Sequence, residues 1–86
     1  MSKVVIGVRV FGDYRLLLTF EGGEDREVDI SRLVPFDGVF EQLKDESYFC
    51  QVRVNHEVGT IIWPNGADLC PDVLYSAGRC VTEHAA

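Results

Sequence analysis

The chain has 86 residues, of which 47% are hydrophobic and 26% charged, and its formal net charge is −6. This length accommodates one domain with one hydrophobic core. The negative charge disfavours direct binding to nucleic acid and to anionic membranes, both of which require clustered Lys and Arg. No apolar run approaches the roughly 20 residues of a membrane-spanning helix, and no signal-peptide cleavage site follows the short run before Arg9. We therefore expect a cytoplasmic protein.

The first thirty residues predict a three-stranded antiparallel meander. Two alternating stretches, 4–11 and 14–20, flank the turn signal Gly12-Asp13. A second turn follows at Gly22-Gly23, where glycine supplies the positive φ that a tight hairpin needs. The alternation directs one wholly apolar face of the first strand to the core: Val4, Ile6, Val8 and Val10.

The third strand of the meander, residues 24–30, has one acidic face. Its positions on one side are Arg26, Val28 and Ile30. Its positions on the other side are all acidic: Asp25, Glu27 and Asp29. Such a face is typical of a strand that is solvated on that side or lies at a sheet edge, where charge blocks pairing with another chain.

The second half of the chain predicts a helix and a further hairpin. A stripe of Phe36, Phe40 and Leu43 indicates a helix over about 38–45, capped by Asp37 and lying across the sheet. Residues 49–55 and 58–63 alternate again and predict two strands joined by a turn at 55–57. In the first of these strands the inward positions are Cys50, Val52 and Val54.

A turn and a short helix are expected to end the domain. The stretch Trp63-Pro64-Asn65-Gly66 stops the last strand, because proline cannot continue a ladder and Asn-Gly favours a turn. Asp68 is expected to cap a helix over about 71–77, with Pro71 at its first position and Gly78 at its end.

The predicted architecture is therefore a single α+β domain over residues 1–78. Five strands form one largely antiparallel sheet, in the order strand, strand, strand, helix, strand, strand, helix. One helix packs on this sheet, and the second, C-terminal helix is short. Residues 79–86 carry no pattern and are expected to be a frayed tail.

Two groups of motifs resemble a known bacterial family. The first, less specific group comprises Tyr14, Leu16, Leu18 and Phe20, then Glu21-Gly22-Gly23-Glu24, Arg26-Glu27-Val28-Asp29, Phe40-Glu41-Gln42-Leu43-Lys44-Asp45 and Phe49. The second, more specific group runs from Gly59 through Trp63-Pro64-Asn65-Gly66, Asp68-Leu69 and Pro71 to Leu74-Tyr75. From about Val5 to Tyr75 the chain resembles the family called domain of unknown function 2442.

The resemblance implies a small α+β fold and no established activity. Some relatives look like this domain followed by a helix-turn-helix, and others lie near toxin–antitoxin-like partners. For this chain we expect any DNA-binding half to be another protein. Cys70 and Cys80 stand outside the family pattern, so the resemblance assigns them no chemistry.

Trp63, Asn65 and Asp68 admit two interpretations. In the first, the turn is a recognition loop that presents Trp63 and Asn65, because aromatic residues dominate the energetics of interfaces. In the second, each residue has a structural role: Trp63 fills one end of the core, Asn65 makes the turn, and Asp68 caps the final helix. Burial of Trp63 favours the second interpretation, and exposure of its ring favours the first.

The acidic face formed by Asp25, Glu27 and Asp29 is a candidate surface for a cation or a basic partner. A strand spaces such carboxylates about 7 Å apart, whereas a calcium site needs six to eight oxygens that wrap the ion. We therefore expect a solvated face and no metal site.

The sequence offers no catalytic or cofactor constellation. Cys70, Cys80 and His84 lack the close spacing of a zinc site. Cys50 and His56 would lie about 20 Å apart along one strand, beyond hydrogen-bond reach. The odd number of cysteines predicts free thiols rather than a disulfide framework.

These observations favour a non-enzymatic protein-binding or regulatory, antitoxin-like domain without a cofactor. Its expected partner is a toxin-like or DNA-binding protein, and its expected interaction surface comprises Trp63, Asn65, Asp68, Asp25, Glu27 and Asp29. The alternative is a small-ligand carrier or enzyme with a pocket beside Trp63, lined by Tyr75 and Asp68. A third hypothesis is a homo-oligomer in which an edge strand pairs with its copy.

Overall fold

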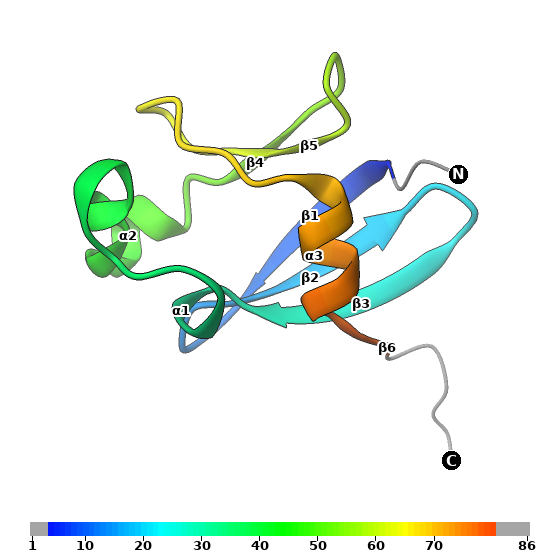
Figure 1. Ribbon diagram of the computed structural model, residues 1–86, viewed down its shortest axis with the longest axis horizontal. Coiled ribbons are helices and arrows are strands. Elements are labelled where there is room, and N and C mark those ends of the chain that lie inside the picture. Colours follow the sequence, from blue (N-terminus) through cyan, green and yellow to red (C-terminus); the bar gives the residue numbers. More distant parts are fainter. Residues whose placement is uncertain (1–3, 81–86) are drawn as a thin grey trace.

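The larger of two sheets is built mainly by the predicted meander. The computed structural model describes residues 4–80. Strands β1 (Val5–Phe11), β2 (Arg15–Phe20), β3 (Glu24–Asp29) and β6 (Arg79–Cys80) lie in that order, and every neighbouring pair is antiparallel. Gly22 and Gly23 have positive φ, as expected for the second turn. The meander is therefore confirmed, and β6 adds a short fourth strand beside β3 (Figure 1).

The later hairpin forms a separate two-stranded sheet, so the prediction of one five-stranded sheet was wrong. This sheet contains β4 (Arg53–Asn55) and β5 (Thr60–Ile62). The strand expected over 49–55 is shorter because Phe49 belongs to a helix and Cys50, expected to face inward, is exposed. The Val5 N–H donates to Gly59 O at 2.9 Å and joins the start of β1 to the hairpin. The coarser prediction, an α+β fold with antiparallel sheets, is confirmed.

A bulge in β1 corrects the predicted core face of that strand. Val8 pairs with Leu18 as expected for a core position, but the register shifts between Val5 and Gly7. An extra residue in one strand reverses which alternate side chains face the core. Val5 is consequently buried, whereas Ile6 is 46% exposed.

The helix predicted over 38–45 is a 3₁₀ helix, and a separate single-turn helix follows it. A short helix, α1 (Ile30–Leu33), follows β3 directly, and the 3₁₀ helix η1 (Gly38–Lys44) comes next. Asp37 stands at the N-cap position of η1, but its side chain makes no capping hydrogen bond. Asp45 then adopts extended backbone angles and begins the single-turn helix α2 (Glu46–Phe49). A 3₁₀ helix repeats every three residues, so Phe40 and Leu43 still share a face.

The core lies between the larger sheet, the hairpin and the helix α3 (Pro71–Ala77), whose bounds match the predicted 71–77. Figure 1 shows α3 crossing the larger sheet. Tyr75 meets the ring of Phe20 edge-on at 5.1 Å, and the guanidinium of Arg26 stacks over the Tyr75 ring at 3.8 Å. The buried hydrophobic residues are Val5, Leu16, Leu18, Phe20, Val28, Ile30, Leu43, Phe49, Ile61, Trp63, Ala67 and Leu74.

Gly78 brings the end of α3 into close contact with β3. Its φ is −79°, so a left-handed conformation is not the reason for glycine. A Cβ at this position would lie 2.8 Å from the Cβ of Arg26 and 3.1 Å from Cγ2 of Val28. Gly78 O also accepts a hydrogen bond from Nη1 of Arg26 at 3.0 Å. The absent side chain therefore sets the distance between α3 and the sheet.

Arg79 and Cys80, expected to belong to a frayed tail, form β6, and the remainder of that predicted tail lies outside the described residues. No helix among residues 4–80 is long and apolar enough to cross a membrane.

Substituting Gly78→Ala should lower the free energy of unfolding by about 1–3 kcal/mol, because the new methyl group must displace β3 or the end of α3. Urea denaturation measures the change. Gly12→Ala is the matched control, since no atom lies within 4 Å of a Cβ placed there, and its effect should stay within about 0.5 kcal/mol. Equal stability of the two variants would contradict the close contact.

The cap of α2 should hold the pKa of Asp45 below its ordinary value. The Ser47 hydroxyl and then the Ser47 backbone N–H, at 2.8 and 3.0 Å, donate to this carboxylate and hold its pKa below the ordinary 3.8. Because the folded pKa is the lower one, the cap contributes full stability above pH 3.8 and loses it as pH falls through the folded pKa. A carbon-detected NMR titration should show this shift, and Ser47→Ala, which removes the hydroxyl but keeps the backbone N–H, should reduce it. An Asp45 that titrates at 3.8 or higher would refute the assignment.

Candidate functional site

Trp63 is a core residue and not part of an exposed recognition loop. Its side chain is 1% exposed, and its Nε1–H donates to Phe49 O at 3.0 Å. The indole also packs against the Phe49 ring at a centroid distance of 5.7 Å. The ring therefore closes one end of the core, and its place on the predicted interaction surface is corrected. Neither of the two surface hollows described below is lined by Trp63.

Asn65 fixes the turn after Trp63 to the helices η1 and α2. Its Nδ2 donates to Val39 O at 2.9 Å and to Gln42 Oε1 at 3.0 Å, and its Oδ1 accepts from the Ala67 N–H at 3.0 Å. Its backbone N–H donates to the Tyr48 hydroxyl at 2.7 Å. The carboxamide is thus engaged within the chain, which favours a structural role.

Asp68 is exposed and does not cap α3, contrary to the prediction. The N-cap residue of α3 is Cys70, whose side chain makes no capping hydrogen bond. A capping side chain must directly precede the first helical residue to reach the free N–H groups, and Asp68 stands two residues too early. Its backbone forms a single bridge with Ile62.

The acidic residues of β3 are largely engaged and not simply solvated, which corrects the second part of the predicted surface. The Glu27 side chain is only 11% exposed and pairs with Arg15 at 2.6 Å and with Arg79 at 3.3 Å. Asp29 caps α1, accepting the N–H and hydroxyl of Ser31. Asp25 is half-buried. The strand lies between β2 and β6 in the sheet. It is an inner strand where β6 pairs with it, at Arg26 and Glu27.

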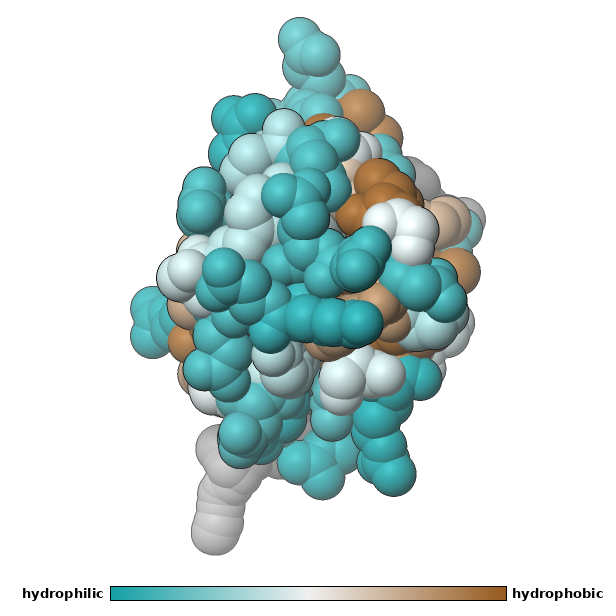
Figure 2. Space-filling model, turned by 90° about the vertical axis from the view of Figure 1, so that its left-hand side faces the viewer, coloured by the Kyte–Doolittle hydropathy of each residue, from teal (hydrophilic) through white to brown (hydrophobic). Residues whose placement is uncertain are grey.

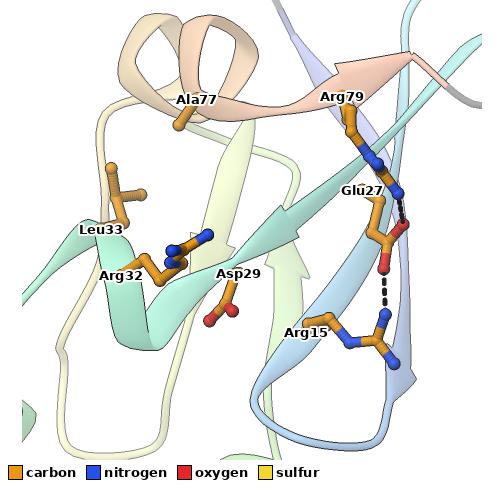
Figure 3. Close-up of a pocket in the computed structure, with 7 residues that line it drawn as sticks. All are labelled: Arg15, Glu27, Asp29, Arg32, Leu33, Ala77 and Arg79. Carbon is orange, nitrogen blue, oxygen red and sulfur yellow. Dashed lines mark hydrogen bonds and ion pairs between the residues drawn. The ribbon is translucent and has the colours of Figure 1, made fainter.

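These residues border a hollow of about 340 Å³ at the end of β3, which we call the arginine hollow. Its lining residues are Arg15, Glu27, Asp29, Arg32, Leu33, Ala77 and Arg79. Figure 3 shows Glu27 held between Arg15 and Arg79, while Arg32 extends from α1 toward β3 with no partner drawn. Leu33 and Ala77 form an apolar part of the wall. Four elements, β2, β3, α1 and β6, supply the charged side chains.

The arginine hollow has more hydrogen-bond donors than acceptors. Each guanidinium carries five N–H donors. Glu27 is occupied by Arg15 and Arg79, and Asp29 by Ser31, whereas Arg32 has no hydrogen bond or ion pair within residues 4–80. Three guanidiniums face two carboxylates, so the hollow has one positive charge in excess in a chain whose net charge is −6. This arrangement favours binding of an anion.

A shallow apolar groove adjoins the arginine hollow. Its lining residues are Leu33, Asp72, Val73, Ser76 and Ala77, and it shares Leu33 and Ala77 with the hollow. Val73 is 45% exposed and supplies a large apolar side chain to the groove. The groove therefore extends the basic hollow with an apolar surface along one side of α3.

The end of the molecule that carries η1 and α2 has a different surface. It is mainly hydrophilic, with a smaller hydrophobic area toward one side (Figure 2). The exposed polar residues of this segment, from η1 through α2, are Glu41, Gln42, Lys44, Asp45, Glu46 and Ser47. They carry both signs of charge, which favours solvation over recognition of one charged group.

Charge and hydrogen bonding also determine the environment of Arg26, the one arginine of β3. Burial tends to lower the pKa of Arg26, but hydrogen bonds with Tyr75 and Glu24 and the negative charge of Glu24 raise it above its ordinary value. Glu24 accepts from Nε of Arg26 at 3.0 Å and from the Tyr75 hydroxyl at 2.8 Å. This cluster attaches α3 to β3 and is structural.

The described residues provide binding groups but no catalytic set. No group of three metal-ligating side chains occurs among them. Cys50 and Cys70 are free and exposed, and neither lines the arginine hollow. The side chains of Cys80 and His84, considered above as zinc ligands, lie outside the described residues. Guanidiniums hold anions but do not act as nucleophile or base at neutral pH.

Sequence reasoning missed all three arginines of the hollow. A partial signal was present for Arg15, because the meander register places it diagonally to Glu27 on the same face of the sheet. Arg32 lies between the predicted third strand and the predicted helix, and Arg79 lies in a segment without pattern. Their convergence depends on how α1 and β6 meet β3.

The comparisons with known proteins identify a family without an assigned activity. The model of the family described as "Protein of unknown function (DUF2442)" matches residues 5–79. No curated protein and no solved structure matches the chain. The chain belongs to this family, which confirms the resemblance found in the sequence.

Substituting Asn65→Ala should lower the free energy of unfolding by about 1–3 kcal/mol, because three side-chain hydrogen bonds are lost together. Urea denaturation measures the effect. The control is Gln51→Ala, which removes an exposed side-chain amide at another position. A stable Asn65→Ala variant that no longer retained a partner would instead support the recognition loop.

Proposed function

We propose that this member of the family is a non-enzymatic, protein-binding regulatory domain that engages an acidic segment of its partner through the arginine hollow. The carrying observation is that the guanidinium of Arg32 has no partner among residues 4–80 and lies in a hollow with excess positive charge. The proposed function is the one expected from the sequence, but the proposed contact surface is the arginine hollow and not the turn at Trp63.

Two features support binding over catalysis. The hollow is lined by arginines, engaged carboxylates and apolar groups, so no lining side chain is arranged as a nucleophile with its base. An acidic chain that concentrates guanidiniums at one place also gains specificity, because its remaining surface repels acidic partners that are wrongly oriented.

The antitoxin-like part of this proposal rests on the family resemblance. A partner of that kind, toxin-like or DNA-binding, would present a carboxylate-bearing segment to Arg32 and be held near this domain. The negative net charge favours an indirect role at DNA, through such a partner, over direct contact with phosphates.

A small-anion carrier is the second candidate function. The volume of the hollow, about 340 Å³, lies at the lower end of the roughly 300–1,000 Å³ typical of ligand pockets. In this candidate function the anion binds in the arginine hollow and not in the pocket expected beside Trp63, because the Trp63 indole is buried. It requires that an isolated anion occupy the site without a partner protein.

Retention of a partner from a lysate of the native host should depend on Arg32. Immobilised wild type should retain a protein that Arg32→Ala does not, and high salt should release it, because exposed charge pairs are screened. Arg53→Ala, which removes an exposed arginine of β4, should behave as wild type. Arg32 is the chosen position because Glu27 needs Arg15 and Arg79 as partners.

Two outcomes would contradict the protein-binding proposal. If the chain were recovered at near-native expression with no protein bound to it, the protein-binding proposal would be contradicted. If Arg32→Ala retained the partner protein as well as wild type does, the contact with the partner would have to lie on another surface. If inorganic phosphate alone raised the melting temperature through Arg32 while no protein was retained, the carrier function would be favoured.

A further inference from the structure

We infer that the occupant of the arginine hollow is an extended peptide segment in which an acidic residue is followed by an apolar one. The acidic side chain binds Arg32, and the apolar side chain lies in the groove beside Leu33 and Val73. This inference rests on the proposed function and adds the sequence pattern that the partner must present.

The carboxylate position follows from the unsatisfied donors of the hollow. Ser31 donates twice to one oxygen of the Asp29 carboxylate, and the Glu27 carboxylate pairs with two arginines. A carboxylate brought by a partner supplies the acceptors that the guanidinium of Arg32 lacks within residues 4–80. A planar guanidinium can bind such a group through two parallel hydrogen bonds.

The edge of β3 favours an extended backbone over a free anion. β6 pairs only with Arg26 and Glu27, and Gly78 lies against Val28, so Asp29 at the end of β3 has no strand beside it. The Ile30 N–H donates to Tyr14 O, on the β2 side. Because the donors of an antiparallel strand alternate in direction, the Asp29 N–H points to the opposite side, toward the arginine hollow. A peptide carbonyl is the natural acceptor for this group.

The apolar groove specifies the neighbouring side chain of the peptide. Leu33 and Ala77 belong to both the hollow and the groove, so the two sites are continuous. Successive side chains of an extended peptide diverge, and one can enter the hollow while the other lies against Val73. Asp72 lines the groove and repels a second carboxylate there, which favours an apolar residue after the acidic one.

Short peptides test this pattern directly. The probe is acetyl-alanyl-glutamyl-leucyl-alanine amide, which has no terminal charge, added to the isotope-labelled full chain. Amide signals of Arg32, Leu33 and Val73 should shift together on titration. Glutamine in place of the glutamate should weaken binding at least about tenfold, because a charge-assisted hydrogen bond is lost. Serine in place of the leucine should weaken it several-fold.

Matched variants of the protein separate the two contacts. Arg32→Gln should abolish the difference between the glutamate and glutamine peptides, and Val73→Ser should abolish the difference between the leucine and serine peptides. Both residues are exposed, so the fold should be retained. Arg53→Gln is the control and should leave every affinity unchanged.

Several outcomes would overturn the inference. Equal binding of the glutamate and glutamine peptides would exclude the carboxylate contact, and shifts produced equally by inorganic phosphate would indicate an anion site without peptide recognition. Concentration-dependent shifts of the same residues without peptide would indicate a second copy of the chain. An Arg32-dependent partner in the lysate, with no binding of any peptide, would reject this pattern and leave the proposed function intact.

Discussion

The close contact between Gly78 and β3 is the constraint on which the arrangement of the candidate site depends. It allows α3 to end against Arg26 and Val28, and it places the next residue, Arg79, beside Glu27. Ala77 is thereby brought to the wall of the hollow. A larger residue at this point would move the helix end away from the sheet, and with it one of the three guanidiniums.

Electrostatics then determines what the hollow can accept. Glu27 lies between two arginines and is mostly shielded from solvent, so it positions those arginines and offers little attraction to a cation. Asp29 is used by the first turn of α1. The acidic side of β3, which in isolation resembles a surface for basic partners, becomes the base of the site proposed here for acidic ones once the arginines are in place.

The most distinctive segment of the sequence has a structural role. Trp63 fills the core and bonds to Phe49, while Asn65 connects the following turn to Val39, Gln42 and Tyr48. These contacts hold the hairpin, η1 and α2 together as one unit against β1. The family signature is therefore a folding signature, and the proposed binding groups lie outside its most specific part.

The sequence alone determined the elements that depend on near neighbours. The meander, the Gly22-Gly23 turn and the helix Pro71–Ala77 follow from alternation, turn chemistry and a proline at the helix start. Asp68 was misassigned, because a helix that begins at Pro71 has its N-cap at Cys70, two residues after Asp68.

Only the tertiary structure decided the features that depend on distant contacts. The bulge beside Ile6, the separation into two sheets and the burial of Trp63 reflect packing between segments far apart in the chain. Arg15, Arg32 and Arg79 meet for the same reason. The partners of a charged side chain depend on the tertiary fold. Local periodicity does not indicate which distant strand or helix end will lie beside it.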